Sequence, residues 1–513
     1  MLVKTFGSAV EGITATLITI EVSISKGEFG IILVGLADNA VRESWSRILT
    51  AFRHNDYLIP RTKVVVNMAP ADKRKVGSAY DLPIALGILA ANGELDPSRF
   101  KDYVIMGEMS LDGSLHPLRG VLPMAIEARK HGFKGIMIPQ SNAREAAIVN
   151  NLDVIPVSSI VEAAQFLGAQ KEIPPIAHDT REMFAHNLNS FANDFADVKG
   201  QENVKRALEI AASGGHNVIM IGPPGAGKTM LAKRIPTILP PMSLEEALET
   251  TKIHSVVGML GQNSSLVAQR PFRSPHHTTS DVALVGGGGY PQPGEISLAH
   301  NGVLFLDELP EFKRSVLEVL RQPLEDRKVT VSRAKSTVDY PANFLLVSSA
   351  NPCMCGFYTH PSRECLCSPP QIQRYFSKIS GPLMDRIDLH IEVTPVPFEE
   401  LSSLATGESS SSVRERVMEA RKIQIRRFTA YKGIHTNAMM PTQMVRKFCR
   451  LDSQGEQLLK VAMKKLSLSA RAFDRILKVS RTIADLAGEE NILSEHVAEA
   501  IQYRSLDREG WGG

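Results

Sequence analysis

The sequence lacks any hydrophobic run long enough to cross a membrane. Its longest apolar stretches, such as residues 82–91 and 218–221, fall well short of the roughly 20 apolar residues that span a bilayer. The N-terminal residues also lack the basic segment, apolar stretch and small-residue cleavage site of a secretory signal. We therefore expect a cytoplasmic protein without membrane contact.

The sequence also has little excess of charge of one sign. Lys and Arg number 58 and Asp and Glu number 55, and a net charge of +3 is too small to indicate a nucleic-acid-binding protein by itself. The basic surplus lies at the C-terminus, where residues 413–513 hold 19 basic and 12 acidic residues. Such a surplus fits a solvated helical surface, and it also suits contact with a polyanion.

Cysteine is scarce, and four of the five cysteines lie within fifteen residues of one another, which argues against a spread disulfide framework. They form two C-x-C pairs, Cys353 with Cys355 and Cys365 with Cys367. Four thiolates in a short irregular loop suit tetrahedral Zn²⁺, so we expect zinc here. Unliganded thiols and redox pairing remain the alternatives. Cys449 stands alone and is expected to be a small buried hydrophobic residue.

The remaining composition, 43% apolar and 22% charged, is that of a globular protein, and 513 residues predict about three domains. Residues 1–170 alternate between strand patterns (18–24, 63–67) and helix patterns (38–52, 81–92), which predicts an α/β domain. Residues 189–398 carry short apolar strands at 217–221, 302–306 and 344–348, which predict a second α/β domain with a parallel sheet. After a Gly/Ser connector at 406–412, residues 413–513 are expected to form an all-α domain.

A segment between a predicted strand and a predicted helix at 230–238 has the spacing of a phosphate-binding P-loop. It consists of Gly222, Pro223, Pro224, Gly225, Ala226, Gly227, Lys228 and Thr229. The glycines let backbone N–H groups surround a β-phosphate. Lys228 is expected to reach the β- and γ-phosphate oxygens, and the Thr229 hydroxyl is expected to bind Mg²⁺. The alternative is an ordinary glycine-rich turn.

Two acidic residues follow the apolar strand pattern at 302–306. This order places Asp307 and Glu308 at the carboxyl end of the strand, where open α/β folds bind ligands. Asp307 would support Mg²⁺ and Glu308 would polarise the attacking water. Two acids in this position are often only a helix cap, but the P-loop favours the catalytic interpretation.

At these residues the sequence resembles an AAA+ ATPase. The strand pattern that ends at Asn351 resembles the one that carries the polar sensor-one residue, and Pro-Leu-Met-Asp-Arg-Ile-Asp around Arg386 resembles the arginine-finger motif of the magnesium-chelatase and MCM branch. Leu-Ser-Ala-Arg ending at Arg471 resembles the start of the sensor-two helix of the lid. Arg-Ser-Pro-His-His ending at His277, and Asn-Pro-Cys-Met-Cys-Gly beginning at Asn351, are typical of the magnesium-chelatase-like YifB/ComM family.

The resemblance covers nearly the whole chain, and it implies the fold and function of that family. It implies an N-terminal Lon-protease-like α/β domain, an AAA+ core and an all-α lid. It also implies a homohexameric, ATP- and Mg²⁺-dependent DNA helicase that acts on single-stranded and branched DNA in branch migration during natural transformation. The alternative function is a chelatase-type motor that remodels a protein partner. The Lon-like domain ahead of the P-loop favours the DNA motor.

The arginine finger, Arg386, has a physical rationale in a ring ATPase. An arginine from the neighbouring subunit can neutralise the charge that develops on the γ-phosphoryl group, which makes hydrolysis depend on assembly. The alternative is a surface ion pair of Arg386 with Asp385 or Asp388.

Arg471 is predicted in the first turn of a helix capped by Ser469. A cation in this position opposes the helix dipole by about 0.3–1 kcal/mol, so we expect an anion opposite it. Nucleotide phosphate is the obvious candidate. Arg475, one turn later, is an alternative for this role.

Two motifs, at residues 77–83 and 107–113, carry the resemblance to the Lon-protease-like domain. In that alignment the nucleophilic serine position falls on Ala79, with Ser78 one residue early, and the segment 118–126 offers no lysine as a base. We therefore expect no peptidase activity and a role in DNA contact or ring support. The polyanion candidates of this domain are Lys73, Arg74 and Lys75.

Residues 328–339 predict a short hairpin with a basic tip formed by Arg333 and Lys335. Family resemblance places such a hairpin in the central pore of the ring, beside an insert at residues 286–290. There the two cations would make salt-sensitive, sequence-independent phosphate contacts with DNA. The alternative is the solvated tip of a surface hairpin.

Overall fold

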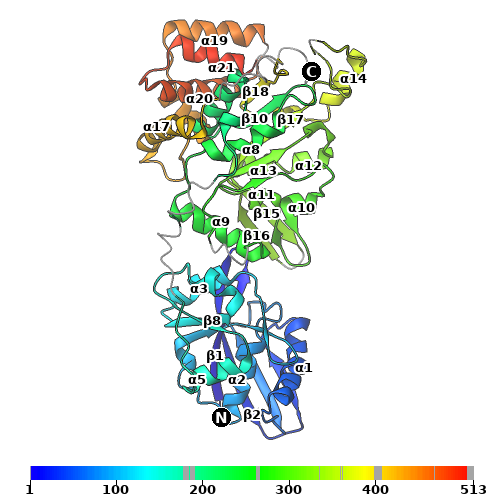
Figure 1. The fold of residues 1–513 in the computed structure, drawn as a ribbon, viewed down its shortest axis with the longest axis vertical. Coiled ribbons are helices and arrows are strands. Elements are labelled where there is room, and N and C mark those ends of the chain that lie inside the picture. Colours follow the sequence, from blue (N-terminus) through cyan, green and yellow to red (C-terminus); the bar gives the residue numbers. More distant parts are fainter. Residues whose placement is uncertain are drawn as a thin grey trace. The chain divides into compact units, whose positions relative to one another are not determined.

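The computed structural model describes residues 2–176, 184, 191–260, 266–333, 336–358, 360, 362–397, 407–466 and 468–504. The chain divides into two units (Figure 1). Unit 1 contains Met1–Leu188 and Ser243–Ala268, and unit 2 contains Asn189–Met242 and Gln269–Gly513. Among the described residues, none of the helices combines the length and the apolar composition that a membrane span requires.

The described residues of unit 1 form three sheets. The largest has the order β1-β2-β4-β3, in which only the β3–β4 pair is parallel. Its strands are β1 (Leu2–Glu11), β2 (Thr14–Ser25), β3 (Gly30–Val34) and β4 (Lys63–Ala69). The second is parallel and consists of β5 (Tyr103–Ile105), β8 (Gly135–Pro139) and β9 (Asp153–Val157), and the third of β6 (Glu108–Met109) and β7 (Leu115–His116). The predicted strands at 18–24 and 63–67 lie within β2 and β4.

Helices of unit 1 cover these sheets. They are α1 (Asn39–His54), α2 (Asp81–Ala91), α3 (Val121–Lys130), α4 (Ala143–Ala146) and α5 (Ile160–Leu167), and the unit also holds the 3₁₀ helices η1 (Phe100–Asp102) and η2 (Gln140–Asn142). The predicted helices at 38–52 and 81–92 correspond to α1 and α2. Nearly every residue of α2 is buried, which explains why its sequence is apolar on all sides.

A helix from the middle of the chain completes unit 1. Helix α9 (Leu244–Val257) packs on α3, and the Ser255 carbonyl oxygen accepts from the Gly120 amide at 3.0 Å. The Ser255 hydroxyl also donates to the carboxylate of Glu145, whose pKa is raised by burial. Residues 243–268 lie inside the predicted range 189–398, yet they pack with the N-terminal unit.

Unit 2 is built on a five-stranded parallel sheet of order β11-β14-β17-β10-β18. Its strands are β11 (Phe272–Arg273), β14 (Val303–Leu306), β17 (Leu345–Ala350), β10 (Val218–Ile221) and β18 (Leu389–Glu392). β10, β14 and β17 are apolar or small at every position and fully buried, as a sheet covered on both faces requires. The three strands predicted from the sequence match them to within two residues at either end.

Further elements surround this sheet. The helices are α7 (Glu202–Gly214), α8 (Lys228–Ile238), α10 (Asp281–Val285), α11 (Glu295–Leu298), α12 (Arg314–Glu318), α13 (Arg321–Asp326), α14 (Pro369–Phe376) and α15 (Gly381–Met384), with the 3₁₀ helices η3 (Phe195–Asp197) and η4 (Leu309–Glu311). Two hairpins extend the unit: β12 (Gly286–Gly287) with β13 (Gln292–Pro293), and β15 (Lys328–Arg333) with β16 (Ser336–Pro341).

The C-terminal part of unit 2 is helical and forms the lid. It consists of α17 (Ser410–Phe428), η5 (Asn437–Met439), α18 (Thr442–Phe448), α19 (Ser453–Lys465), α20 (Ala470–Ala487) and α21 (Ser494–Gln502), drawn in orange to red beside β10 and β18 in Figure 1. The predicted connector at 406–412 is partly wrong, since α17 begins at Ser410. Ser409 caps it by accepting from the Ser412 amide at 3.2 Å. The mixed α/β fold with a parallel sheet and a helical C-terminal region is confirmed.

Because its strands are parallel, the sheet has one edge where all strands begin and one where all strands end. Gly222, Asp307 and Asn351 follow β10, β14 and β17, and we call this the carboxyl edge. Asn217 and Asp388 precede β10 and β18, and we call this the amino edge. At about 3.3 Å per residue, the two edges lie roughly 16 Å apart along β10.

Candidate active site

The P-loop lies at the carboxyl edge, between β10 and α8. Gly225 and Gly227 have φ angles of +80° and +90°, which side chains other than glycine rarely adopt. At Gly222 a Cβ atom would come within 2.1 Å of the Val393 carbonyl oxygen, so no larger residue fits. The chain thus forms a tight turn directly before α8, and a helix N-terminus after such a turn is a favourable place for a phosphate group.

Lys228 is folded back over this loop. Its ammonium group donates to the carbonyl oxygens of Gly222 and Pro223 and lies 3.2 Å from Asn351 Oδ1. Burial lowers the pKa of Lys228 to about 8. A phosphate at this position would replace the carbonyl contacts and favour the charged ammonium.

Thr229 and Asp307 lie together, as the sequence predicts for two Mg²⁺ ligands. The Thr229 hydroxyl donates to Asp307 Oδ2 at 2.8 Å, and the Ser349 hydroxyl donates to Asp307 Oδ1. Ser349 lies in β17, next to β14, so the neighbouring strand orients the carboxylate. Oxygen ligands of this kind suit Mg²⁺.

Glu308 has an unusual backbone conformation. Its φ angle is +53°, and its amide donates to Ser349 Oγ at 3.2 Å and to Asp307 Oδ1 at 3.1 Å. The half-exposed carboxylate of Glu308 lies 3.7 Å from Nδ1 of His277. His277 in turn packs against Phe312. Left-handed backbone at a non-glycine residue is often kept at functional sites.

The predicted arginine finger, Arg386, lies at the amino edge and not beside its own P-loop. It is only 7% exposed, donates to the Pro382 carbonyl oxygen and forms an ion pair with Glu325. The structure contradicts the alternative of a surface ion pair with Asp385 or Asp388. Those two carboxylates pair with arginines of the lid instead.

Both candidate sensor-two arginines also lie at the amino edge. Ser469 caps α20 as predicted. The side chain of Arg471 is 64% exposed and lies 3.8 Å from Asp385, whereas Arg475 forms an ion pair with the buried Asp388. The sheet therefore separates both arginines from the P-loop of the same chain.

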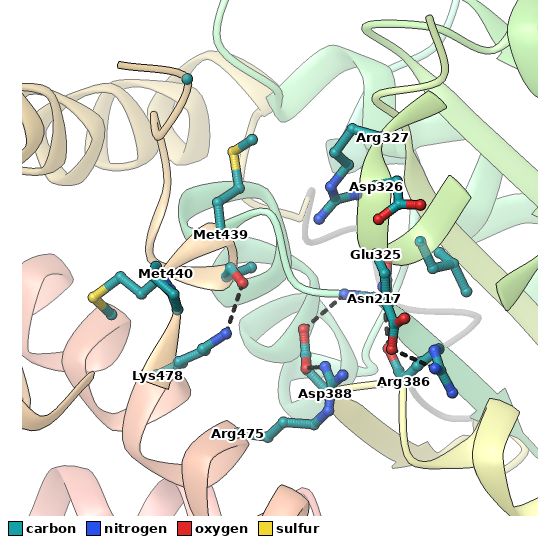
Figure 2. A pocket seen from close by; sticks show the side chains of 14 residues that line it. Asn217, Glu325, Asp326, Arg327, Arg386, Asp388, Met439, Met440, Arg475 and Lys478 are labelled. Atoms are coloured by element: carbon teal, nitrogen blue, oxygen red, sulfur yellow. Dashed lines mark hydrogen bonds and ion pairs between the residues drawn. The ribbon is translucent and has the colours of Figure 1, made fainter. Parts of the chain in front are cut away.

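A cavity of about 510 Å³ lies between the end of α13, the finger loop at 386–388 and α20 (Figure 2). Its charged lining residues are Glu325, Asp326, Arg327, Arg386, Asp388, Arg475 and Lys478. The finger and Arg475 thus share one cavity, although 89 positions separate them in the sequence.

The four clustered cysteines come together directly after β17. Their sulfur atoms all lie within 4.8 Å of one another, with three pairs at 3.3, 3.6 and 3.7 Å. These distances exceed the roughly 2.05 Å of a disulfide bond, so the thiols are not paired. A hydrogen bond from the backbone amide of Phe357 lowers the pKa of the Cys355 thiol to about 6. The isolated Cys449 is buried, as predicted.

The cysteine loop also touches the P-loop. At Gly356 a Cβ atom would come within 2.6 Å of the Pro224 ring. Asn351 lies two residues before Cys353, so the cysteine loop adjoins the carboxyl edge both at Asn351 and at Pro224.

The predicted basic hairpin is present as β15 and β16. Arg333 is exposed, and a Cβ atom at Gly287 would come within 2.6 Å of its guanidinium, so β15 lies beside the β12–β13 insert. Lys335 lies outside the described residues.

In unit 1, one of the three polyanion candidates is wrong. Lys75 is fully buried and donates its ammonium to the Pro70 carbonyl oxygen, so it cannot contact DNA. Lys73 is partly exposed and forms a 3.0 Å ion pair with Glu11.

Comparison with family models covers most of the chain. The model described as magnesium chelatase, subunit ChlI, matches residues 194–401. Subunit ChlI of Mg-chelatase matches residues 20–142, and the ChlI C-terminal model matches residues 407–504.

Individual relatives give the same assignment. The chain is 43% identical to Competence protein ComM of Haemophilus influenzae, over 98% of this chain and 97% of that protein. It is 42% identical to the uncharacterized protein YifB of Escherichia coli, over 97% of this chain and 96% of that protein. Lon protease 2 of Bacillus subtilis is 34% identical over 27% of this chain and 26% of that protein. The chain belongs to the magnesium-chelatase-like AAA+ ATPases of the ComM/YifB type.

Proposed function

We propose that the protein is a hexameric, ATP- and Mg²⁺-dependent DNA motor that acts in branch migration during natural transformation. The carboxyl edge would supply the phosphate site: Lys228 would hold the β- and γ-phosphates, and Asn351 Oδ1 lies 3.2 Å from the Lys228 ammonium. Thr229 and Asp307 would hold Mg²⁺, which supplies charge neutralisation at the phosphates when bound. Glu308 polarises the attacking water.

The observation that carries the assembly is the separation of this site from the arginines. Arg386, Arg471 and Arg475 lie at the amino edge, roughly 16 Å along β10 from the P-loop of the same chain. Arginines there serve catalysis only if they reach the nucleotide of a neighbouring subunit. This arrangement supports a closed ring, and the hexamer in the proposal is what the family resemblance implies.

The cysteine cluster fits zinc in chemistry and size. A Zn–S distance of about 2.3 Å with tetrahedral angles separates sulfurs by about 3.8 Å, close to the 3.3–3.7 Å found for three pairs. We propose that Cys353, Cys355, Cys365 and Cys367 hold one structural zinc ion. Such a site would stiffen the loop between Asn351 and the P-loop.

The DNA part of the proposal rests on the β15–β16 hairpin and on the similarity to a protein named for competence. Arg333 is exposed at the tip of a two-stranded arm, beside a glycine-rich second hairpin. Cations on such an arm suit phosphate contacts that carry no sequence preference.

A motor that remodels a protein partner is the second candidate, because the family models carry the name of magnesium chelatase. The two functions differ in their response to DNA. The experiment is ATPase activity with and without forked, three-stranded and four-way DNA. Stimulation by DNA is expected, and its absence with all three substrates would contradict the DNA motor.

A variant locates the DNA contact. Arg333→Ala combined with Lys335→Ala should keep assembly and basal ATPase activity but lose stimulation by DNA and unwinding. The salt dependence of DNA binding should also become flatter. The matched control replaces two exposed cations of unit 1, Lys130 and Lys134, by alanine. Wild-type unwinding by the hairpin variant at moderate salt would place the DNA elsewhere.

A further inference from the structure

We infer that Asp388 is a positioning residue that joins lid helix α20 to the arginine finger, so that the lid sets where Arg386 points. This inference rests on the proposed role of Arg386 in the neighbouring active site. It assigns a function to a carboxylate that does not itself touch nucleotide.

The contacts of the Asp388 carboxylate come from two elements, the loop before β10 and lid helix α20. Its carboxylate accepts from the ring of His216 at 3.2 Å and from the backbone amide of Asn217 at 3.3 Å, both at the end of the loop before β10. On the other side it forms the ion pair with Arg475 of α20 (Figure 2). Asp388 is only 3% exposed, so these partners replace water.

The same residues hold the backbone of the finger. The Asn217 side-chain amide donates to the Arg386 carbonyl oxygen at 3.1 Å, and the Asp388 amide donates to the Asn217 carbonyl oxygen at 3.0 Å. Asn217 Oδ1 accepts from the Leu346 amide at the start of β17. Arg386 is thereby fixed to the central strands at its backbone, while Glu325 holds its guanidinium.

The charge of the Asp388 carboxylate is maintained despite burial. Burial alone would raise the pKa of Asp388, but Arg475 and His216 together lower it well below the ordinary value. A buried carboxylate with charged and hydrogen-bonded partners loses several kcal/mol of stabilisation when one partner is removed. The lid therefore cannot move away from the finger loop without breaking this ion pair.

A second set of contacts connects His216, a partner of Asp388, to the interior of the lid. His216 Nε2 lies 2.7 Å from the Thr482 hydroxyl of α20, and Thr482 accepts from Asn437 at 3.0 Å. Asn437 also donates to Asp485, which pairs with Arg427 of α17. Motion of the lid is transmitted to the finger loop through Asp388 and His216.

The test is Asp388→Asn, which keeps the shape and removes the charge. We expect turnover of the assembled ring to fall by about 10–100-fold, the effect of misplacing a catalytic group, with nucleotide affinity unchanged. The decisive readout is subunit mixing. Asp388→Asn chains keep an intact phosphate site, so mixing with Lys228→Ala chains, which offer an intact finger, should restore hydrolysis. Mixing with Arg386→Ala chains should not.

The control variant is Glu499→Gln, which breaks another ion pair between lid and core, with Arg206, far from the finger in sequence and contacts. It should keep turnover within about 2-fold of wild type. Arg475→Gln breaks the Asp388 ion pair from the lid side and should reproduce the mixing behaviour even if Asp388→Asn folds poorly.

The outcomes separate the two proposals. If Arg386→Ala is rescued by Lys228→Ala but neither Asp388→Asn nor Arg475→Gln is, the positioning role is overturned and the finger in trans stands. If Arg386→Ala is itself not rescued despite co-assembly, the finger in trans is overturned and the positioning role falls with it.

Discussion

The two edges of the five-stranded sheet carry different kinds of polar site. At the carboxyl edge, Lys228 and Thr229 begin α8 directly after the P-loop and Asp307 follows β14, so the loops next to the strands supply all three side chains. At the amino edge, Arg386 and Asp388 are held by residues far away in the sequence, from α13 and from the lid. The loops that follow the strands arrange the carboxyl edge, whereas the packing of α13 and of the lid against the sheet arranges the amino edge.

This difference indicates how the catalytic groups are divided. A single chain presents the P-loop on one edge and the arginines on the other, so under the proposed function a complete site would combine edges from two chains. The lid belongs to the arginine side, since α20 supplies Arg471 and Arg475. The lid should therefore act on the neighbour's nucleotide rather than on its own.

The strongest test of this division removes one charged side chain from each edge, in two separate variants. Lys228→Ala should abolish nucleotide binding, because the ammonium is the charge of the P-loop. Arg386→Ala should leave binding intact and lower turnover by about 10³-fold, the lower end of the known effect of arginine fingers. Nucleotide titration and steady-state ATPase rates separate the two. Equal nucleotide affinity in Lys228→Ala and wild type would contradict the first assignment.

Mixing the two variants is the control for assembly. A mixed ring contains interfaces with an intact phosphate site and an intact finger, so partial activity should return. No recovery at any ratio, with co-assembly shown by mass or by cross-linking, would mean that both edges act within one chain.

Within the carboxyl edge, Glu308→Gln should retain nucleotide binding and lower turnover by about 10²–10⁴-fold, because the amide cannot accept the proton of the attacking water. Its neighbour Ser349 offers a matched comparison. Ser349→Ala removes the hydroxyl that contacts Asp307 and Glu308, and it should have a smaller effect on turnover. Normal turnover in Glu308→Gln would remove this carboxylate from catalysis.

The two edges also differ in how far the sequence predicts them. The P-loop and the strands before Asp307 and Asn351 are contiguous patterns, so their meeting at one edge follows from parallel strand order alone. The partner of Arg386 could not be predicted this way. Glu325 lies 61 residues earlier, and only the packing of α13 against the finger loop brings the two together.

Long-range packing also explains what the sequence did not predict at two other residues. Lys75 looked like an exposed loop cation, but the fold buries its ammonium on the Pro70 carbonyl oxygen. The sequence marks His277 only as part of a family motif, although its Nδ1 lies 3.7 Å from Glu308. The cysteine cluster, in contrast, was predictable because its four cysteines lie within fifteen residues of one another.

The cysteine cluster provides a smaller perturbation of the carboxyl edge. We expect one zinc ion per chain, and Cys365→Ser should lower stability by about 2 kcal/mol, or roughly 4–8 °C in melting temperature. Because the loop touches Pro224, nucleotide affinity should also fall. Elemental analysis of protein purified without chelators measures the metal, and Cys449→Ser is the matched control. Protein free of zinc would contradict this site.

The smallest expected effect concerns the amino edge and its dependence on pH. Burial lowers the pKa of His216 below its ordinary value, although Asp388 acts in the opposite direction. The unfolded chain therefore binds a proton near pH 6.5 that the folded chain does not bind, so stability is lost as pH falls below about 6.5. One such proton amounts to at most about 1.4 kcal/mol per pH unit.

His216→Asn should be less stable at pH 7 but should lose about 1 kcal/mol less between pH 6.5 and pH 5.5, or roughly 2–4 °C. His131→Asn, at an exposed position of unit 1, is the control. Thermal melts across this range measure the difference. Equal slopes of stability against pH for His216→Asn and wild type would show that the lid contact is not sensitive to protons.

Asp388 contributes to the pH dependence only at lower pH, since its lowered pKa keeps it charged until well below pH 4. A loss of stability that began only below pH 4 would therefore assign the acid sensitivity of this edge to the carboxylate and not to the imidazole.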